Sequence, residues 1–391
     1  MRLYPLFIFR ANNYSVVKIA SLCFIALATI FFTFTTASAQ APNDDLENLI
    51  DKLLDSEKSE QSDIIKSIIG LNPQPEKIEE LLKSGRKYSN DIEKGWHILS
   101  TLCKDGISRP FHVYIPDSYD SSKKLPVLIN LHGGVSKPQL LPENVVMNLR
   151  TMWEPEANNY IVILPLGQRG CSWWDEVGAS AILGALHVVA SIYNIDENRI
   201  YLSGFSDGGS GTYYMAHCHS TPFAAFVVLN GSVAVAEQGG EQVYLPSFSN
   251  KPLYAVSGGK DKLYPATYIK PYIDEMKKAG VDVTYKVYEN ARHDFSYGDK
   301  EKKNIIAFLN KKERKPFPSK ITIETANENL GRIHYVKIDR IEDINNNENF
   351  PDYNVPFVKR IIIGIALDEK FPGPGVRIDD IGEGTFAQTA G

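Results

Sequence analysis

Ser206 has the surroundings that best fit chemistry, because glycines stand two positions before it and two after it, at Gly204 and Gly208. The apolar run Arg199–Ser203 precedes this stretch, and Gly209–His217 has the pattern of a helix with small residues in its first turn. Small residues permit a tight strand-to-helix turn, which lifts a serine oxygen clear of the backbone. The helix N-terminus then favours negative charge beside that oxygen. The stretch predicts a serine nucleophile that attacks a carbonyl carbon and forms an oxyanion.

Asp261 and His293 follow Ser206 in the chain, each on a loop after an apolar strand. Asp261 comes shortly after Leu253–Ser257, and His293 comes after Val283–Tyr288. Because the carboxyl ends of parallel strands meet at one edge of a sheet, the three side chains should converge there. His293 would take the proton of Ser206 and pass it to the leaving group. Asp261 would hold the imidazole tautomer and stabilise the imidazolium.

Three acids are rivals to Asp261, and one later histidine, His334, is a rival to His293. Asp274 falls inside an amphipathic helix, and Asp282 precedes a strand, at the wrong end of it. Asp294 is next to the histidine in sequence and would point elsewhere, and His334 lies in a strand-like stretch of a later region. The sequence therefore favours the first pair as the acid and the base.

The second source of oxyanion donors is a His-Gly-Gly turn that follows the apolar strand Leu125–Leu131. Backbone N–H groups in such a turn, together with that of the residue after the nucleophile, stabilise the oxyanion of acyl transfer. The candidates are the amides of Gly134 or Gly133 and of Asp207. The alternative is that the glycines are needed only for positive φ. His132 is expected to brace the loop rather than to react.

The chain resembles a group of secreted α/β-hydrolases related to polyhydroxybutyrate depolymerases, feruloyl esterases and prolyl-oligopeptidase-type hydrolases. The resemblance covers roughly residues 95 to 312 and is carried by four motifs: Leu131–Gly134, Gly204–Gly209, Gly258–Asp261 and Ala291–His293. It implies the α/β-hydrolase fold and a Ser-Asp-His triad. Asp207 stands where many of the esterases have alanine, which leaves the substrate class open.

An aromatic segment, Cys171–Asp175, resembles one that those esterases place near the active-site cleft. Trp173 and Trp174 are therefore candidates for a wall against the substrate, since aromatic faces suit aryl or sugar groups. The alternative is that one or both belong to the core.

The cysteines after the N-terminal segment are odd in number: Cys103, Cys171 and Cys218. Cys171 and Cys218 both belong near the expected active-site face, so a disulfide between them stays open, while Cys103 is expected to be a buried thiol in a strand. His217 and His219 flank Cys218, but neighbouring side chains on a helix point in different directions. We expect neither a metal site nor a cofactor.

The elements that must position these residues alternate between strands and helices, which predicts a mostly parallel, doubly wound sheet. A hairpin, Trp96–Cys103 with Arg109–Ile115, opens the predicted catalytic domain of residues 93–313. Strands are then expected at 126–131, 160–164, 199–203, 224–229, 253–257 and 283–288, and helices near 176–193, after Ser206, and near 265–279 and 299–310.

The N-terminus predicts a signal peptide over residues 1–39, cleaved after Ala39. Arg2, Arg10 and Lys18 precede the apolar stretch Ile19–Phe34, and small residues follow it. The alternative is an uncleaved anchor, but the stretch is shorter than the ~20 residues that span a bilayer. We expect an exported, secreted or periplasmic protein without a stable membrane span after cleavage. Residues 40–92 have helical spacing and predict an N-terminal helical segment.

The C-terminal part is expected to form a separate β-rich domain over residues 318–391, after the charged, proline-bearing stretch Lys311–Pro318. Its strands would lie at 320–324, 332–338, 360–367 and 375–381. This order resembles PDZ domains of secreted bacterial enzymes, which implies a peptide C-terminus as partner, with Ile363–Ala366 as the carboxylate loop. The family's pattern would continue past Gly391, so we expect an incomplete domain that is less stable than the hydrolase.

The composition and net charge restrict the classes of function that the chain could have. A net charge of −5 with 43% hydrophobic residues fits a globular enzyme and offers no basic stripe for nucleic acid. The sequence predicts an exported serine esterase that cleaves carboxylic esters of small or polymeric substrates through an acyl-enzyme intermediate. The alternatives are a prolyl-oligopeptidase-type peptidase and a binding module that kept the fold but lost catalysis.

Overall fold

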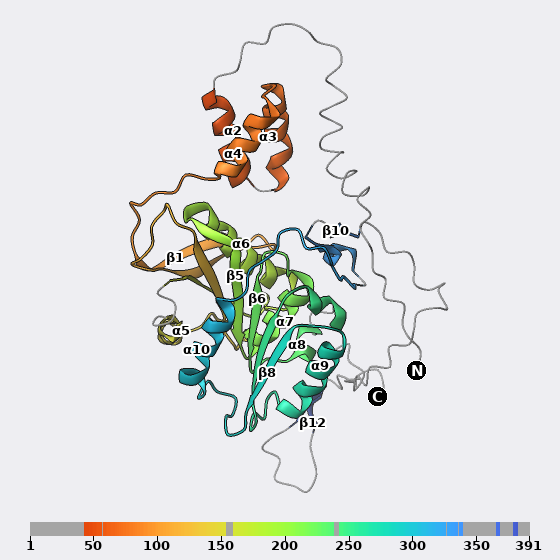
Figure 1. The fold of residues 1–391 in the computed structure, drawn as a ribbon. Helices are drawn as coiled ribbons and strands as arrows, with labels where there is room; N and C mark the ends of the chain where they lie inside the picture. The colour runs from red at the N-terminus through yellow and green to blue at the C-terminus, as the bar shows by residue number, and fades with distance from the viewer. Residues whose placement is uncertain are drawn as a thin grey trace, which may run out of the picture. The chain divides into compact units, whose positions relative to one another are not determined.

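A computed structural model describes residues 43–56, 58–153, 159–237, 242–325, 327–334, 336–338, 365–367 and 378–381 (Figure 1). The chain divides into two compact units, Met1–Ile341 and Glu342–Gly391. The predicted signal peptide lies outside the described residues. Among the described residues, no helix combines the length and the apolar character that crossing a membrane requires.

The first unit is built on an eight-stranded sheet with the strand order β1-β2-β4-β3-β5-β6-β7-β8. β1 pairs antiparallel with β2, and β2 with β4, whereas the other neighbours are parallel. The predicted hairpin and the mostly parallel sheet are confirmed. The strands are β1 Gly95–Leu102, β2 Ser108–Ile115, β3 Leu125–Leu131, β4 Ile161–Pro165, β5 Ile195–Phe205, β6 Ala225–Leu229, β7 Leu253–Gly258 and β8 Val283–Tyr288.

Helices cover both faces of this sheet, because alternate residues of its central strands point to opposite sides. In β6, Phe226 and Val228 belong to one core cluster, and Val227 and Leu229 belong to the other. The first cluster includes side chains of α6 Glu176–Ile192, α7 Asp207–Cys218 and α9 Ala266–Lys278. The second includes side chains of α5 Glu143–Trp153 and α10 Gly298–Leu309. A strand buried on both faces reads as a continuous apolar run, as these strands do.

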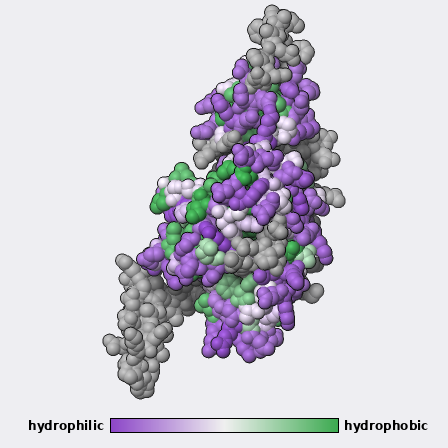
Figure 2. Space-filling model, turned by 90° about the vertical axis from the view of Figure 1, so that its left-hand side faces the viewer, coloured by the Kyte–Doolittle hydropathy of each residue, from purple (hydrophilic) through white to green (hydrophobic). Residues whose placement is uncertain are grey.

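Some elements of the first unit were not expected from the sequence. They are the helix α5, the short helix α8 Val233–Ala236 and the 3-10 helices η2 Leu245–Asn250 and η3 Glu328–Leu330. At the outer end of the sheet, one face of β1 contacts α6, while Ile98 and Leu102 on its other face are exposed. Figure 2 shows several hydrophobic areas within a largely hydrophilic face of the molecule.

The predicted N-terminal helices are present. They are α2 Asn43–Asp55, α3 Lys58–Gly70 and α4 Pro75–Ser84. Leu46, Ile50 and Ile68 form their small core, at the helical spacing seen in the sequence. Pro75 occupies the first turn of α4, where a missing N–H removes no helical hydrogen bond.

The segment after α10 stays with the hydrolase rather than separating at residue 318. Residues 320–324 form no strand, because their backbone pairs with side chains: Thr322 N–H donates to Asn250 Oδ1 at 2.9 Å and Glu324 N–H to Ser247 Oγ at 2.9 Å. Leu330 belongs to the main core cluster. The predicted strand over 332–338 is reduced to a pair of short strands, β9 Arg332–Ile333 and β10 Val336–Lys337.

The second unit contains two short strands that the structure describes, β11 Ile365–Leu367 and β12 Ile378–Ile381, paired antiparallel. Both fall inside stretches predicted to be strands. Ile365 and Ala366 of the proposed carboxylate loop lie in β11, and Ile363 and Gly364 lie outside the described residues. This pair of strands does not support a PDZ-like region, which stays a prediction.

Candidate active site

The turn that carries Ser206 joins β5 directly to α7 and has an unusual backbone. Ser206 has φ 58° and ψ −121°, a conformation that L-residues rarely adopt. A Cβ added at Gly204 would lie 2.1 Å from the carbonyl oxygen of Gly208, and one at Gly208 would lie 2.0 Å from that of Leu131. No side chain fits at either glycine, so the spacing seen in the sequence follows from the tightness of the turn.

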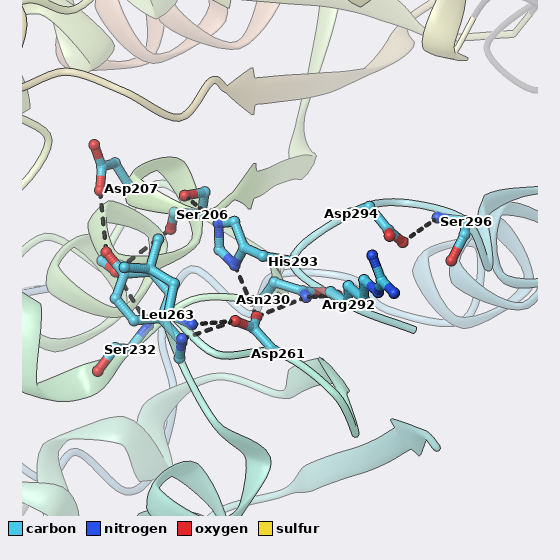
Figure 3. A network of polar contacts seen from close by, with 12 residues as sticks. Ser206, Asp207, Asn230, Ser232, Asp261, Leu263, Arg292, His293, Asp294 and Ser296 are labelled. Atoms are coloured by element: carbon cyan, nitrogen blue, oxygen red, sulfur yellow. Dashed lines mark hydrogen bonds and ion pairs between the residues drawn. The ribbon is translucent and has the colours of Figure 1, made fainter. Parts of the chain in front are cut away.

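The structure brings Ser206, His293 and Asp261 into one chain of hydrogen bonds (Figure 3). The Ser206 Oγ lies 2.8 Å from Nε2 of His293, and Nδ1 of His293 lies 2.7 Å from Oδ2 of Asp261. Ser206 and Asp261 are buried, and the His293 side chain is 23% exposed. A neutral His293 with its proton on Nδ1 accepts from the serine hydroxyl, which is the arrangement that general-base catalysis requires.

The three rival acids and His334 have different partners. Asp274 accepts from Lys270 Nζ at 2.6 Å, Asp282 from Lys312 Nζ at 2.8 Å, and Asp294 from the Ser296 amide at 3.0 Å. The backbone of His334 donates to Thr221 Oγ1 at 2.9 Å. Each is therefore engaged apart from the serine–histidine–aspartate chain.

Asp261 is fixed by donors on both carboxylate oxygens. Oδ1 accepts from the amides of Leu263 at 2.8 Å and Tyr264 at 2.9 Å, and Oδ2 accepts from Asn230 Nδ2 at 3.0 Å in addition to His293. Burial alone would raise the pKa of Asp261, but the hydrogen bonds from Tyr264, His293 and Asn230 outweigh it and lower the pKa. The carboxylate therefore stays charged beside the imidazole.

Asn230 is a site residue that sequence reasoning missed. It follows β6, has φ 48° and is fully buried. Its Nδ2 also donates to the carbonyl oxygen of Arg292 at 3.1 Å, and Tyr297 donates its hydroxyl to Asn230 Oδ1. Asn230 thereby ties the acid loop to the residue before His293. The signal was present as an Asn-Gly pair after a buried strand, because asparagine tolerates positive φ.

The predicted oxyanion turn lies against the nucleophile. A Cβ added at Gly133 would lie 2.9 Å from Ser206 Cβ and 3.3 Å from its Oγ, and Gly134 has φ 75°. Within the described residues, the amides of Gly134 and Asp207 have no hydrogen-bond acceptor. Glycine is thus needed here both for close approach and for positive φ, and the two amides remain candidates for binding an oxyanion.

His132 braces this turn, as expected. Its Nδ1 donates to the carbonyl oxygen of Gly133 at 2.7 Å, and its Nε2 accepts from the amide of Gly167 at 3.0 Å. Burial lowers the pKa of His132 to about 4. Only the neutral ring can accept from Gly167, so protonation would break this contact.

Acidification should therefore destabilise the fold. Burial lowers the pKa of His132 and of His217 to about 4, whereas an unfolded histidine titrates near 6.5. The unfolded chain then binds more protons between pH ~6.5 and ~4, so stability should fall by up to about 3 kcal/mol per histidine as the pH falls through that window. Urea unfolding at pH 7.5 and 4.5 measures it.

The matched controls are His217→Gln, which removes one partly buried imidazole, and His187→Gln at an exposed position. The first should lose less stability on acidification than the wild type, and the second should lose as much. An equal loss in all three proteins would contradict the role given to His217.

The prediction that Trp173 forms a wall against the substrate is wrong. Trp173 is 0% exposed, and its Nε1 donates to the carbonyl oxygen of His132 at 2.8 Å. A Cβ at Gly211 would lie 2.1 Å from Trp173 Cβ, so the tryptophan packs directly on the backbone of α7. Trp174 is 9% exposed and belongs to the same core cluster. The aromatic segment supports the oxyanion turn from within the core.

No disulfide is formed by Cys103, Cys171 or Cys218. Cys171 clusters with Cys103 rather than with Cys218, so the considered Cys171–Cys218 disulfide is not formed. Cys103 follows β1 instead of lying within it.

The two histidines that flank Cys218 have separate partners. His217 Nε2 accepts from the amide of Tyr244 at 2.9 Å, and His219 Nε2 lies 3.1 Å from Glu176 Oε1. Within the described part of the chain, no group of three or more His, Cys, Asp or Glu residues could hold a metal ion.

The sheet order, the strained serine turn and the chain of hydrogen bonds behind it together define an α/β-hydrolase with the site of a serine hydrolase. Residues 172–315 match the model of the dienelactone hydrolase family. That match covers α6 through α10 and includes Ser206, Asp261 and His293.

Two curated relatives are esterases by name. The chain is 33% identical over 133 residues to the bifunctional acetylxylan esterase/xylanase XynS20E of Neocallimastix patriciarum, covering 33% of this chain and 19% of that protein. It is 27% identical over 157 residues to "Probable feruloyl esterase C" of Aspergillus terreus, covering 39% and 58%. The aligned stretches thus span less than two thirds of either relative. A solved thermostable esterase superposes with a TM-score of 0.46 and 20% identity, over 56% of this chain and 63% of that one.

Proposed function

We propose that this protein is an exported serine hydrolase that cleaves carboxylic esters through an acyl-enzyme intermediate. The observation that carries the proposal is the hydrogen-bonded chain from Ser206 Oγ through His293 to Asp261. The names of the curated relatives support an ester as substrate. Export is supported by the predicted signal peptide of residues 1–39.

In the first half of the reaction, Ser206 Oγ attacks the ester carbonyl carbon while His293 Nε2 takes the hydroxyl proton. The amides of Gly134 and Asp207 would bind the oxyanion that forms. His293 then gives its proton to the leaving alcohol as the C–O bond breaks, and an acyl-serine remains. Asp261 keeps its charge and stabilises the imidazolium.

In the second half, water takes the place of the alcohol. His293 accepts a proton from the water, whose oxygen attacks the acyl carbon. Collapse of the second tetrahedral intermediate returns that proton to Ser206 Oγ and releases the carboxylic acid.

The second candidate within enzymes is a peptidase of the prolyl-oligopeptidase type. The same triad can cleave amides, and Asp207 after the serine does not distinguish the two classes. What separates them is the leaving group, since an amine needs protonation before it departs and an alcohol needs less help.

The test is a panel of p-nitrophenyl esters, feruloylated sugars and aminoacyl amides offered to the purified protein, with a fluorophosphonate probe as an independent readout. We expect hydrolysis of the esters and probe labelling that disappears in Ser206→Ala. Labelling without turnover of any ester, together with cleavage of the amides, would favour the peptidase. An unlabelled, inactive wild type would support the binding module.

A further inference from the structure

Asp207, the residue after the nucleophile, uses both of its carboxylate oxygens. Oδ2 accepts from the backbone amide of Val135 at 3.0 Å, and Oδ1 accepts from the hydroxyl of Tyr264 at 3.2 Å. Val135 follows Gly134 in the oxyanion turn and is completely buried. The carboxylate thus connects the oxyanion turn to α7. The turn carries the amide of Gly134, one candidate oxyanion donor, and Asp207 itself carries the other.

Tyr264 connects the same carboxylate to the acid and the base. Its backbone amide donates to Asp261 Oδ1 at 2.9 Å. Its ring meets the imidazole of His293 edge-on, with centroids 5.4 Å apart and planes at 80°. Burial, and then the neighbouring Asp207, raise the pKa of the Tyr264 hydroxyl, so it remains a hydrogen-bond donor.

Three segments of the chain therefore meet at the Asp207 side chain. The oxyanion turn, the start of α7 and the loop after β7 are separate in sequence, and Asp207 bonds to the first and third while belonging to the second. In Figure 3 Asp207 lies on the far side of Ser206 from His293, so it is placed to support the serine without touching the base.

We propose that Asp207 is a positioning residue whose carboxylate sets the oxyanion turn against Ser206 and couples that turn, through Tyr264, to the loop of Asp261. This inference rests on the proposed function. It assigns to an acidic side chain beside the nucleophile a geometric role, and it requires neither contact with substrate nor a change of charge during the reaction.

The variants separate geometry from charge. Asp207→Ala removes both acceptors. Asp207→Asn keeps one oxygen for Val135 N–H, and its amide N–H can donate to the Tyr264 oxygen once the hydroxyl rotates. Tyr264→Phe removes only the bond between the two side chains. All three are compared as purified full chains well below their melting temperatures.

Asp207→Ala should lower kcat and the fluorophosphonate labelling rate by roughly 10- to 100-fold with little change in KM, because an oxyanion donor acts only once the oxyanion forms. Asp207→Asn should stay within about threefold of wild type, and Tyr264→Phe should lose less than Asp207→Ala. In the double variant Asp207→Ala/Tyr264→Phe the losses should not add. Equal losses in the Asn and Ala variants would show that charge, not geometry, matters, and would overturn the proposal.

Hydrogen exchange keeps this test separate from that of the proposed function. In Asp207→Ala the Val135 amide should exchange faster, while the Val227 amide in the central strand β6 should not change. A wild type that is labelled by the probe but hydrolyses no ester would contradict the esterase proposal. The labelling rates of the variants would then still test the positioning role of Asp207. If neither activity nor labelling is seen, an unchanged Val135 exchange rate in Asp207→Ala would still overturn the positioning role.

Discussion

Ser206→Ala should lower ester turnover by about 10⁴-fold or more, and His293→Ala should do the same. The serine supplies the atom that bonds to the acyl carbon. Among the residues that the structure describes, the histidine is the group placed to take the serine proton, with Nε2 2.8 Å from Ser206 Oγ. Because the two residues act as one unit, the double variant should have nearly the same rate as either single variant. Initial rates with the best ester of the panel measure all three.

Matched controls come from the rival histidine and one rival acid, which the structure places apart from this chain of hydrogen bonds. His334→Ala and Asp294→Ala should keep near wild-type rates, since the first bonds to Thr221 through its backbone and the second caps the Ser296 amide. An active His293→Ala beside an inactive His334→Ala would show that the base has been assigned to the wrong residue.

Trp173→Ala should destabilise the protein by about 3–5 kcal/mol, the cost of removing a large aromatic side chain from a packed core. The indole is 0% exposed and lies on two glycines, since a Cβ at Gly167 would come 2.6 Å from its ring and one at Gly211 would come 2.1 Å from its Cβ. The variant would also leave the His132 carbonyl without its indole donor. Urea unfolding followed by circular dichroism measures the loss.

Tyr268→Ala is the control for aromatic content, because that side chain is 66% exposed, and its replacement should change stability by less than about 0.5 kcal/mol. Trp173→Phe should fall between the two, since it keeps an aromatic ring and loses the N–H. A loss below about 1 kcal/mol in Trp173→Ala would mean that the indole is not packed as described.

The sequence predicted the sheet and the serine–histidine–aspartate geometry because both depend on local patterns. Apolar runs marked the strands, and the positions of Asp261 and His293 just after two of them placed both at the edge where Ser206 turns. Asn230 and Tyr264 were missed because their roles depend on contacts between loops that are far apart in sequence. Asn230 lies 31 residues from its partner Asp261, and Tyr264 lies 57 residues from its partner Asp207.

Trp173 was misassigned for a related physical reason. The sequence pattern of an aromatic residue near a site is the same whether its side chain faces the cleft or the core. Here the absence of side chains at Gly167 and Gly211 leaves the space in the core that the indole fills. Residues 320–324 alternate like a strand, but a strand needs a backbone partner, and the side chains of Ser247 and Asn250 took that place.

The three described cysteines make the core next to the site observable without any engineered reporter residue. Burial raises the pKa of Cys171 to about 12, and Cys103 and Cys218 are also buried, at 4% and 7% exposure. A thiol reacts as its thiolate and only where a reagent can reach it, so these sulfurs should be silent in the native fold. Their rate of modification by a thiol reagent then measures how often the packing around the aromatic segment opens. A ligand that binds at the site and stabilises this packing should lower that rate.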